Sequence, residues 1–555
     1  MRLMLAGTLA TLTAASLAMI RPALLTDDER TAAHSIHEGR WRSDVRFLSS
    51  DLLEGRAPGT RGEELAREYV AARFEAIGLE PGAPGRAWEQ PVELVGVTSH
   101  APSELRVTRG KNALALRLSD DYVAWSNRAE PQSRIDDAEI VFVGYGIVAP
   151  EFAWDDFKGA DLRGKVLLVM NNDPERDPAL FGGKRRLHYG RWDYKYEMAA
   201  AQGAAGAIVI HTNNSAGYGW NVVQSSWAGE QLSLAAAGGH ELAAKAWATE
   251  EACRRIARLA GRDLDALRAS AESRDFRPVP LGVKTSLLLR NDVARRTSAN
   301  VIGRLPGSDP SLAREAVLYT AHHDHYGTRP GPDGGTQIYN GALDNAAGVA
   351  TLLAVAEAFA SLPERPRRSI LFASVTAEEQ GLLGSLYLSQ HLPLAPGLVA
   401  ANVDIDGASI WGRTRDVSVI GLGKSSLDDW VRALAEMQGR SVVPEAYPDK
   451  GAYYRSDHLS FARIGVPSAY LEAGTDVRGR PPGWGRERRQ AWEEAHYHQP
   501  SDDMTPDWDL SGAMEDAQLV FLLGLKVANA PLPPSWRPGD EFEGARKKAL
   551  AELGR

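Results

Sequence analysis

Histidines and carboxylates gather in five short segments of the C-terminal half of the chain. The segments are TAHHDHY (320–326), GALDNAAG (341–348), TAEEQGLLG (376–384), ANVDIDG (401–407) and YHQPSD (497–502). Zinc binds nitrogen and oxygen ligands, and two zinc ions held about 3.5 to 4 Å apart need a bridging carboxylate and about two further ligands each. The order and content of the segments therefore predict a two-zinc hydrolytic site.

Each segment offers one candidate metal ligand. These candidates are His322, Asp344, Glu379, Asp404 and His498. Glu378 is left beside Glu379 and cannot reach the same metal ion in the same way. Because a spare carboxylate next to a metal-bound water can accept its proton, we predict that Glu378 is the general base.

Apolar runs place three of these segments at the ends of predicted strands. Residues 315–320, 369–376 and 397–403 form such runs, and each stops at or just before a candidate ligand. Residues 345–362 are apolar and long enough for a buried helix, so Asp344 lies at or just before its first turn. Since α/β sheets bind ligands at the carboxyl ends of their strands, we expect these segments to meet at one edge of a sheet.

Taken together, the five segments resemble the motifs of the M28 family of co-catalytic zinc exopeptidases. The resemblance implies an α/β fold whose mixed, mainly parallel sheet is flanked by helices. It also implies two Zn²⁺ ions per chain, with His322 and Asp404 at one ion, Glu379 and His498 at the other, and Asp344 bridging both. Asp324, in the His-x-Asp motif, would orient the imidazole of His322 from the second shell of the site.

The activity implied by the resemblance is that of an aminopeptidase acting on peptides. In such a site a free substrate amine can bind one zinc ion while the other polarises the scissile carbonyl. Tyr454 and Arg455 precede the sequence SDH (456–458) and are candidates for stabilising the oxyanion or binding a substrate terminus.

Three alternatives remain open on the sequence alone. A carboxypeptidase of the same fold would need basic residues near the substrate carboxylate, and Arg455 or the arginines within residues 478–489 could supply them. An acyltransferase similar to glutaminyl cyclase would use a single zinc ion. A non-catalytic binding protein on this scaffold would be expected to lack ligands or the general base, whereas this chain has all of them.

The resemblance extends to an inserted domain. Residues 141–174 and 189–227 resemble the protease-associated (PA) domain that many bacterial members of this family carry. We therefore expect five regions: a signal peptide or N-terminal anchor (1–25), the first part of the catalytic domain (26–134), an inserted β-rich PA domain (135–285), the remainder of the catalytic domain (286–535) and a charged tail (536–555).

Composition and charge favour a soluble, exported protein. The 555 residues are 44% hydrophobic and can bury large cores, while a formal charge of −9 gives no reason to expect a nucleic-acid partner. Residues 3–20 carry no charge and follow Arg2, which predicts an export signal and a periplasmic or secreted location. If that segment is not cleaved, it would instead tether the chain to a membrane.

Overall fold

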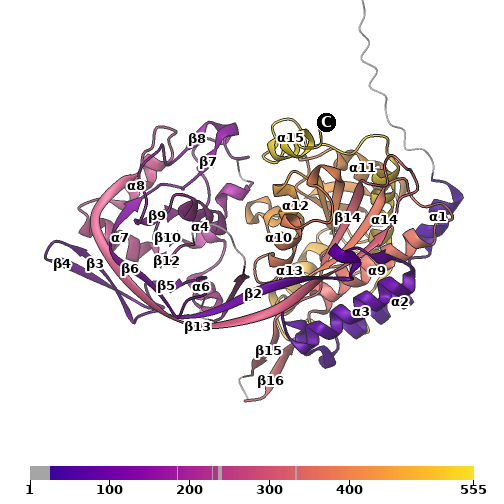
Figure 1. Ribbon diagram of the computed structural model, residues 1–555, viewed down its shortest axis with the longest axis horizontal. Coiled ribbons are helices and arrows are strands. Elements are labelled where there is room, and N and C mark those ends of the chain that lie inside the picture. Colours follow the sequence, from indigo (N-terminus) through magenta and orange to yellow (C-terminus); the bar gives the residue numbers. More distant parts are fainter. Residues whose placement is uncertain (1–24, 184, 228, 236–240, 332–333, 555) are drawn as a thin grey trace, which may run out of the picture.

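Two lobes make up the fold (Figure 1). The computed structural model describes residues 25–554 except 184, 228, 236–240 and 332–333, so the predicted signal or anchor lies outside the described residues apart from its last position. The larger lobe carries the five segments with candidate ligands, and the smaller lobe lies beside it at the left of the figure.

The sheet of the larger lobe is mixed and mainly parallel, as predicted. Its strand β14 (Ala316–His322) pairs in parallel with both β17 (Ser369–Val375) and β18 (Val399–Asp404). On the β18 side, the sheet continues with β21 (Ser468–Ala473), β19 (Asp416–Ile420) and β20 (Ser441–Pro444). On the β17 side, it continues with β13 (Val279–Leu305) and β1 (Glu80–Pro81). Every residue of β14, β17 and β18 is buried, which explains their largely apolar sequences.

Helices pack on both faces of this sheet. They are α1 (Asp27–His34), α2 (Glu38–Leu48), α3 (Arg61–Ile77), α9 (Ala347–Ala360), α10 (Leu383–Gln390), α11 (Leu427–Met437), α12 (His458–Arg463), α13 (Trp484–His496) and α14 (Ser511–Asn529). Among the described residues, only the helical stretch Ala342–Ala360 is long and apolar enough to cross a membrane, and 83% of its apolar window is buried inside the lobe. It is therefore the predicted buried helix that follows Asp344.

The strands of the smaller lobe join the same hydrogen-bonded sheet through their pairing with β13. Its strands are β3 (Glu104–Arg109), β4 (Asn112–Arg117), β5 (Tyr122–Trp125), β6 (Gln132–Phe142), β9 (Val166–Met170), β10 (Gly206–His211) and β12 (Ala244–Thr249). The helices of this lobe are α4 (Trp192–Ala201), α5 (Asn213–Ala216), α6 (Trp220–Ser226), α7 (Glu250–Leu259) and α8 (Leu264–Ala271). Two long strands, β2 (Glu89–His100) and β13 (Val279–Leu305), pair antiparallel and join this lobe to the larger one (Figure 1).

The smaller lobe begins earlier than the predicted boundary at residue 135. Leu105 and Tyr122 share a buried cluster with Ile140, and β3 pairs with β13. Because β2 and β13 pass between the lobes as continuous strands, no linker marks the boundary in the sequence.

The C-terminal residues are also folded rather than forming the predicted charged tail over 536–555. They contain helix α15 (Glu543–Ala551), and Trp536 and Phe542 before it are only 4% and 5% exposed. Lys424 anchors the same segment through ion pairs with Asp540 at 3.0 Å and Glu541 at 2.7 Å.

Candidate metal centre

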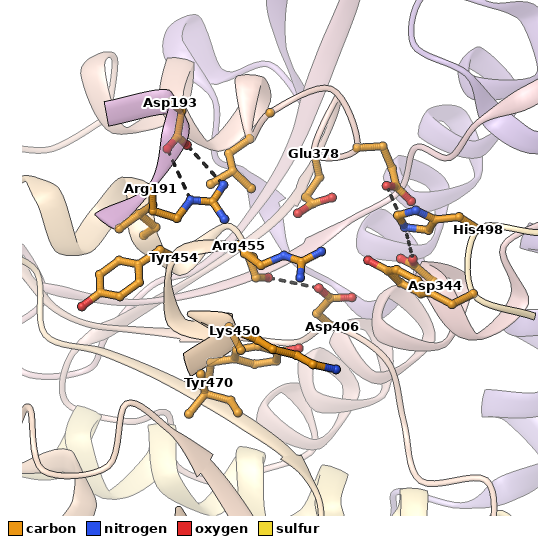
Figure 2. A pocket seen from close by; sticks show the side chains of 18 of the residues that line it. Arg191, Asp193, Asp344, Glu378, Asp406, Lys450, Tyr454, Arg455, Tyr470 and His498 are labelled. Carbon is orange, nitrogen blue, oxygen red and sulfur yellow. Dashed lines mark hydrogen bonds and ion pairs between the residues drawn. The ribbon is translucent and has the colours of Figure 1, made fainter. Parts of the chain in front are cut away.

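Four of the five predicted ligands converge at the carboxyl edge of the large sheet. His322 ends β14, and its Nε2 lies 3.3 Å from Oδ1 of Asp344. The Nε2 of His498 lies 3.2 Å from Oδ2 of the same aspartate and 3.2 Å from Oε2 of Glu379. Asp344 therefore directs one carboxylate oxygen toward each imidazole, which is the geometry of a bridging ligand. Figure 2 shows the side that faces His498.

The fifth predicted ligand, Asp404, does not join this group. Its Oδ1 accepts a hydrogen bond from Thr320 at 2.5 Å, and its Oδ2 accepts one from Ser456 at 2.7 Å and lies 3.2 Å from Nδ1 of His458. Both oxygens are thus occupied inside the protein. Asp406, two residues further on, instead places its Oδ1 3.5 Å from Nε2 of His322.

The residues present fit two metal ions. Two sets of donor atoms each lie within 4.8 Å of one another, His322 with Asp344 and Asp406, and His325 with Asp344 and Glu379. Nε2 of His322 and Nε2 of His498 are buried without a hydrogen-bond partner among the described residues. Buried polar atoms normally have hydrogen-bond partners, so buried nitrogens without such partners that face carboxylate oxygens indicate a cation-binding site.

Electrostatics distinguish the carboxylates of the site. Burial, together with the charge of Asp344, raises the pKa of Glu379 to about 8. Burial also acts to raise the pKa of Asp344, but hydrogen bonds from His322 and His498 hold it well below its usual range. Hydrogen-bond donors on both sides thus favour an ionised Asp344, as two bound cations would.

Glu378 points into the cleft without contacting the donor pair of His498 and Asp344 (Figure 2). The pKa of Glu378 lies well above its usual range, chiefly because the carboxylate is buried. The charge of Glu379 raises this pKa further, whereas His322 lowers it. The carboxylate of Asp324 fixes the backbone of this segment. It accepts hydrogen bonds from the N–H groups of Glu378 at 3.0 Å and Glu379 at 3.4 Å.

The predicted role of Asp324 is accordingly altered. Its carboxylate lies 3.8 Å from Nδ1 of His322, while its backbone carbonyl oxygen lies closer, at 3.3 Å. The main chain of Asp324 therefore faces the imidazole, and its side chain supports the segment that carries both glutamates.

Three supporting residues escaped the sequence analysis or were assigned no role in it. Asp502 accepts hydrogen bonds from the N–H groups of Leu343 at 2.9 Å and Asp344 at 3.1 Å, and burial raises its pKa to about 7. His458 holds Asp404 in place.

Arg56 is the third, and it is 1% exposed. Its guanidinium donates to the carbonyl oxygens of His323 at 2.7 Å and Gly341 at 3.1 Å, which flank two of the ligands. Only the turn-rich sequence around it (49–59) could have drawn attention to this residue.

A cleft of about 2480 Å³ opens over the metal centre between the two lobes. Arg455 extends its guanidinium into this cleft near Glu378, and Arg191 of the smaller lobe, paired with Asp193, lies farther along it (Figure 2). Arg455 makes no ion pair with any described residue, which leaves it available to a substrate. Tyr454, by contrast, is 1% exposed and donates its hydroxyl to Glu541 at 2.6 Å, so the prediction that it binds substrate finds no support in its placement.

Comparison with known proteins finds similarity to peptidases. The sequence profile described as Peptidase family M28 matches residues 300–522. Aminopeptidase NAALADL1 of Mus musculus is 32% identical over 177 residues, which cover 28% of this chain and 22% of that protein. Aminopeptidase YwaD of Bacillus subtilis is 29% identical over 228 residues, covering 40% of this chain and 43% of that protein.

Leupeptin-inactivating enzyme 1 of Streptomyces exfoliatus is 25% identical over 256 residues, 44% of this chain and 52% of that enzyme. The chain thus spans about half the length of this relative and of YwaD, and less of NAALADL1. Among solved structures, an aminopeptidase from Aneurinibacillus sp. strain AM-1 aligns over 92% of this chain and 97% of that chain, with 20% identity and a TM-score of 0.46.

Proposed function

We propose that this chain, whose residues 300–522 match the profile described as Peptidase family M28, is a co-catalytic dizinc aminopeptidase that removes N-terminal residues from peptides. The observation that carries this proposal is the position of Asp344, with one oxygen near the imidazole of His322 and the other near that of His498. A carboxylate placed in this way can join two metal ions. The aminopeptidase names of several relatives support the direction of attack.

We assign His322 and Asp406 to one zinc ion, Glu379 and His498 to the other, and Asp344 to both. Asp406 replaces the predicted Asp404 because its oxygen is the one directed toward His322. Asp404 then acts indirectly, by holding Ser456 and His458 against the strand end.

The bound zinc ions would lower the pKa of a water molecule and polarise the scissile carbonyl. Glu378 accepts the proton of that water and delivers it to the leaving amine. Asp324 fixes the backbone at Glu378, so the carboxylate stays aimed into the cleft. The smaller lobe, which we interpret as a PA domain, forms the opposite wall of the cleft and limits which peptides enter it.

One observation favours the carboxypeptidase alternative. Arg455 presents a guanidinium without an ion-pair partner among the described residues, and a guanidinium binds a carboxylate through two parallel hydrogen bonds. In an aminopeptidase the same group would bind the carboxylate of a short peptide or a backbone carbonyl.

We also propose that the protein is exported, with peptides as its partners. This rests on the uncharged run of residues 3–20 after Arg2, which lies outside the described residues. An uncleaved segment would leave the enzyme tethered to a membrane.

A pair of substitutions tests the metal assignment. We expect the wild-type protein to bind two zinc ions, Asp406→Asn to lose the ion shared with His322, and the matched variant Asp404→Asn to keep both. Zinc content after dialysis, measured by elemental analysis, checks this. Loss of an ion from Asp404→Asn with full retention by Asp406→Asn would contradict the assignment and restore Asp404 as the ligand.

A further inference from the structure

The two candidate histidine ligands differ in what supports the ring nitrogen that faces away from the metal. His322 has the backbone carbonyl of Asp324 3.3 Å from its Nδ1. His498 has a side chain instead, since the hydroxyl oxygen of Tyr326 lies 3.1 Å from its Nδ1. A substitution can remove the second contact but not the first.

The direction of the hydrogen bond follows from the position of the other nitrogen. Nε2 of His498 is directed at oxygens of Asp344 and Glu379, both 3.2 Å away, so Nε2 is the atom that can bind metal. A metal-binding imidazole is neutral and carries its proton on the opposite nitrogen. Nδ1 of His498 therefore donates, and the phenol oxygen of Tyr326 accepts.

No other acceptor for this proton is found among the described residues. The opposite side of the ring stacks on Tyr497, with ring centroids 3.7 Å apart, and stacking provides no hydrogen bond. The imidazole thus depends on its side-chain neighbours for its orientation.

Tyr326 is itself held by a short hairpin of β15 (Gly327–Pro330) and β16 (Thr336–Tyr339) (Figure 1). The guanidinium of Arg329 lies 4.9 Å from the ring centroids of both Tyr326 and Tyr339, a distance typical of cation–π contacts. At the base of the hairpin, Gly55 fits so closely that a Cβ atom would lie 2.5 Å from the carbonyl oxygens of Gly327 and Tyr339. The phenol is therefore fixed from several sides.

We propose that Tyr326 is a positioning residue that accepts the Nδ1–H hydrogen bond of His498 and fixes this histidine as the ligand of the zinc ion it shares with Glu379. The inference rests on the proposed dizinc function. Partners of this kind tune metal sites strongly, and their loss typically weakens metal binding by about 10- to 100-fold. The effect should be confined to one of the two ions, because His322 keeps its main-chain partner.

Zinc titration of the apo-protein against a chromophoric chelator tests this inference. Tyr326→Phe keeps the ring over Arg329 and removes only the acceptor, so we expect one of the two binding steps to weaken about 10- to 100-fold while the other changes little. Tyr339→Phe is the matched control, since its hydroxyl bonds to none of the described site residues, and both its steps should equal those of the wild type. Thermal unfolding of each apo-variant checks that the fold is kept.

Two outcomes would separate the inference from the function on which it rests. If the wild type binds two ions and Tyr326→Phe binds both with wild-type affinity, Tyr326 has no positioning role and the dizinc proposal stands. If the wild type itself fails to bind a second ion, the proposed function is wrong and the inference is overturned with it.

Discussion

Glu378 and Glu379 are adjacent in the chain, yet their carboxylates face different partners. Glu379 lies against His498, whereas Glu378 extends into the cleft with a pKa raised chiefly by burial. A carboxylate with a raised pKa that is close to a bound water can both accept and return a proton near neutral pH. We therefore assign different roles to Glu378 and Glu379 because their side chains leave the same turn in different directions.

We predict that Glu378→Gln lowers kcat by at least about 10² to 10⁴ while zinc content stays at the wild-type level, because only a proton acceptor is lost. Glu379→Gln is the matched comparison and should lose zinc at the His498 side. Steady-state kinetics together with elemental analysis distinguish the two effects. Near-normal turnover by Glu378→Gln would remove this residue from the mechanism.

Most of the residues that we assign to the site follow from the sequence, but our choice of Asp406 over Asp404 does not. In an extended segment, side chains two residues apart point to the same face, so both acids of NVDID are directed toward the site. Which one reaches the metal depends on Thr320, Ser456 and His458, which bind Asp404 and come from other segments. Tyr326 was missed because its hydrogen bond joins residues far apart in sequence.

At the scale of elements, apolar runs predicted the strands and the central helix well because these elements are buried on all sides. Helix α15 was not predicted because only Arg546 and Ala549 within it are buried. Its anchoring depends on Trp536 and Phe542, which precede the helix in an irregular segment. Periodicity arguments cannot detect an element held by residues outside it.

This anchoring predicts the effect of truncating Trp536. Its ring is buried and its Nε1–H donates to the carbonyl oxygen of Gly465 at 2.9 Å, so Trp536→Ala should lower the free energy of unfolding by about 3 to 5 kcal/mol. Leu532→Ala is the control, because Leu532 is 78% exposed and its truncation should cost little. Urea unfolding compares the two variants. An equal, small effect of both would show that the C-terminal segment does not stabilise the fold.

The two lobes of the molecule together form the cleft. Strands β2 and β13, which run through both lobes, pair with each other along a long antiparallel ladder. Continuous strands cross between the lobes, so no linker separates them. The PA insertion over residues 135–285 stays a prediction. The proposed metal ligands lie on one wall of the cleft and Arg191 of the smaller lobe lines the other, so we expect a substrate to bind between the lobes.

The central claim is that this cleft cleaves peptides from their free N-terminus. Its most direct test follows one peptide in three forms, unmodified, N-acetylated and C-terminally amidated, by mass spectrometry of the products of the zinc-loaded enzyme. We predict that the unmodified and amidated forms lose their N-terminal residue, while the acetylated form stays intact because its blocked nitrogen cannot bind zinc. Shortening of the acetylated peptide from its C-terminus, with the amidated form refused, would contradict the aminopeptidase account and identify a carboxypeptidase.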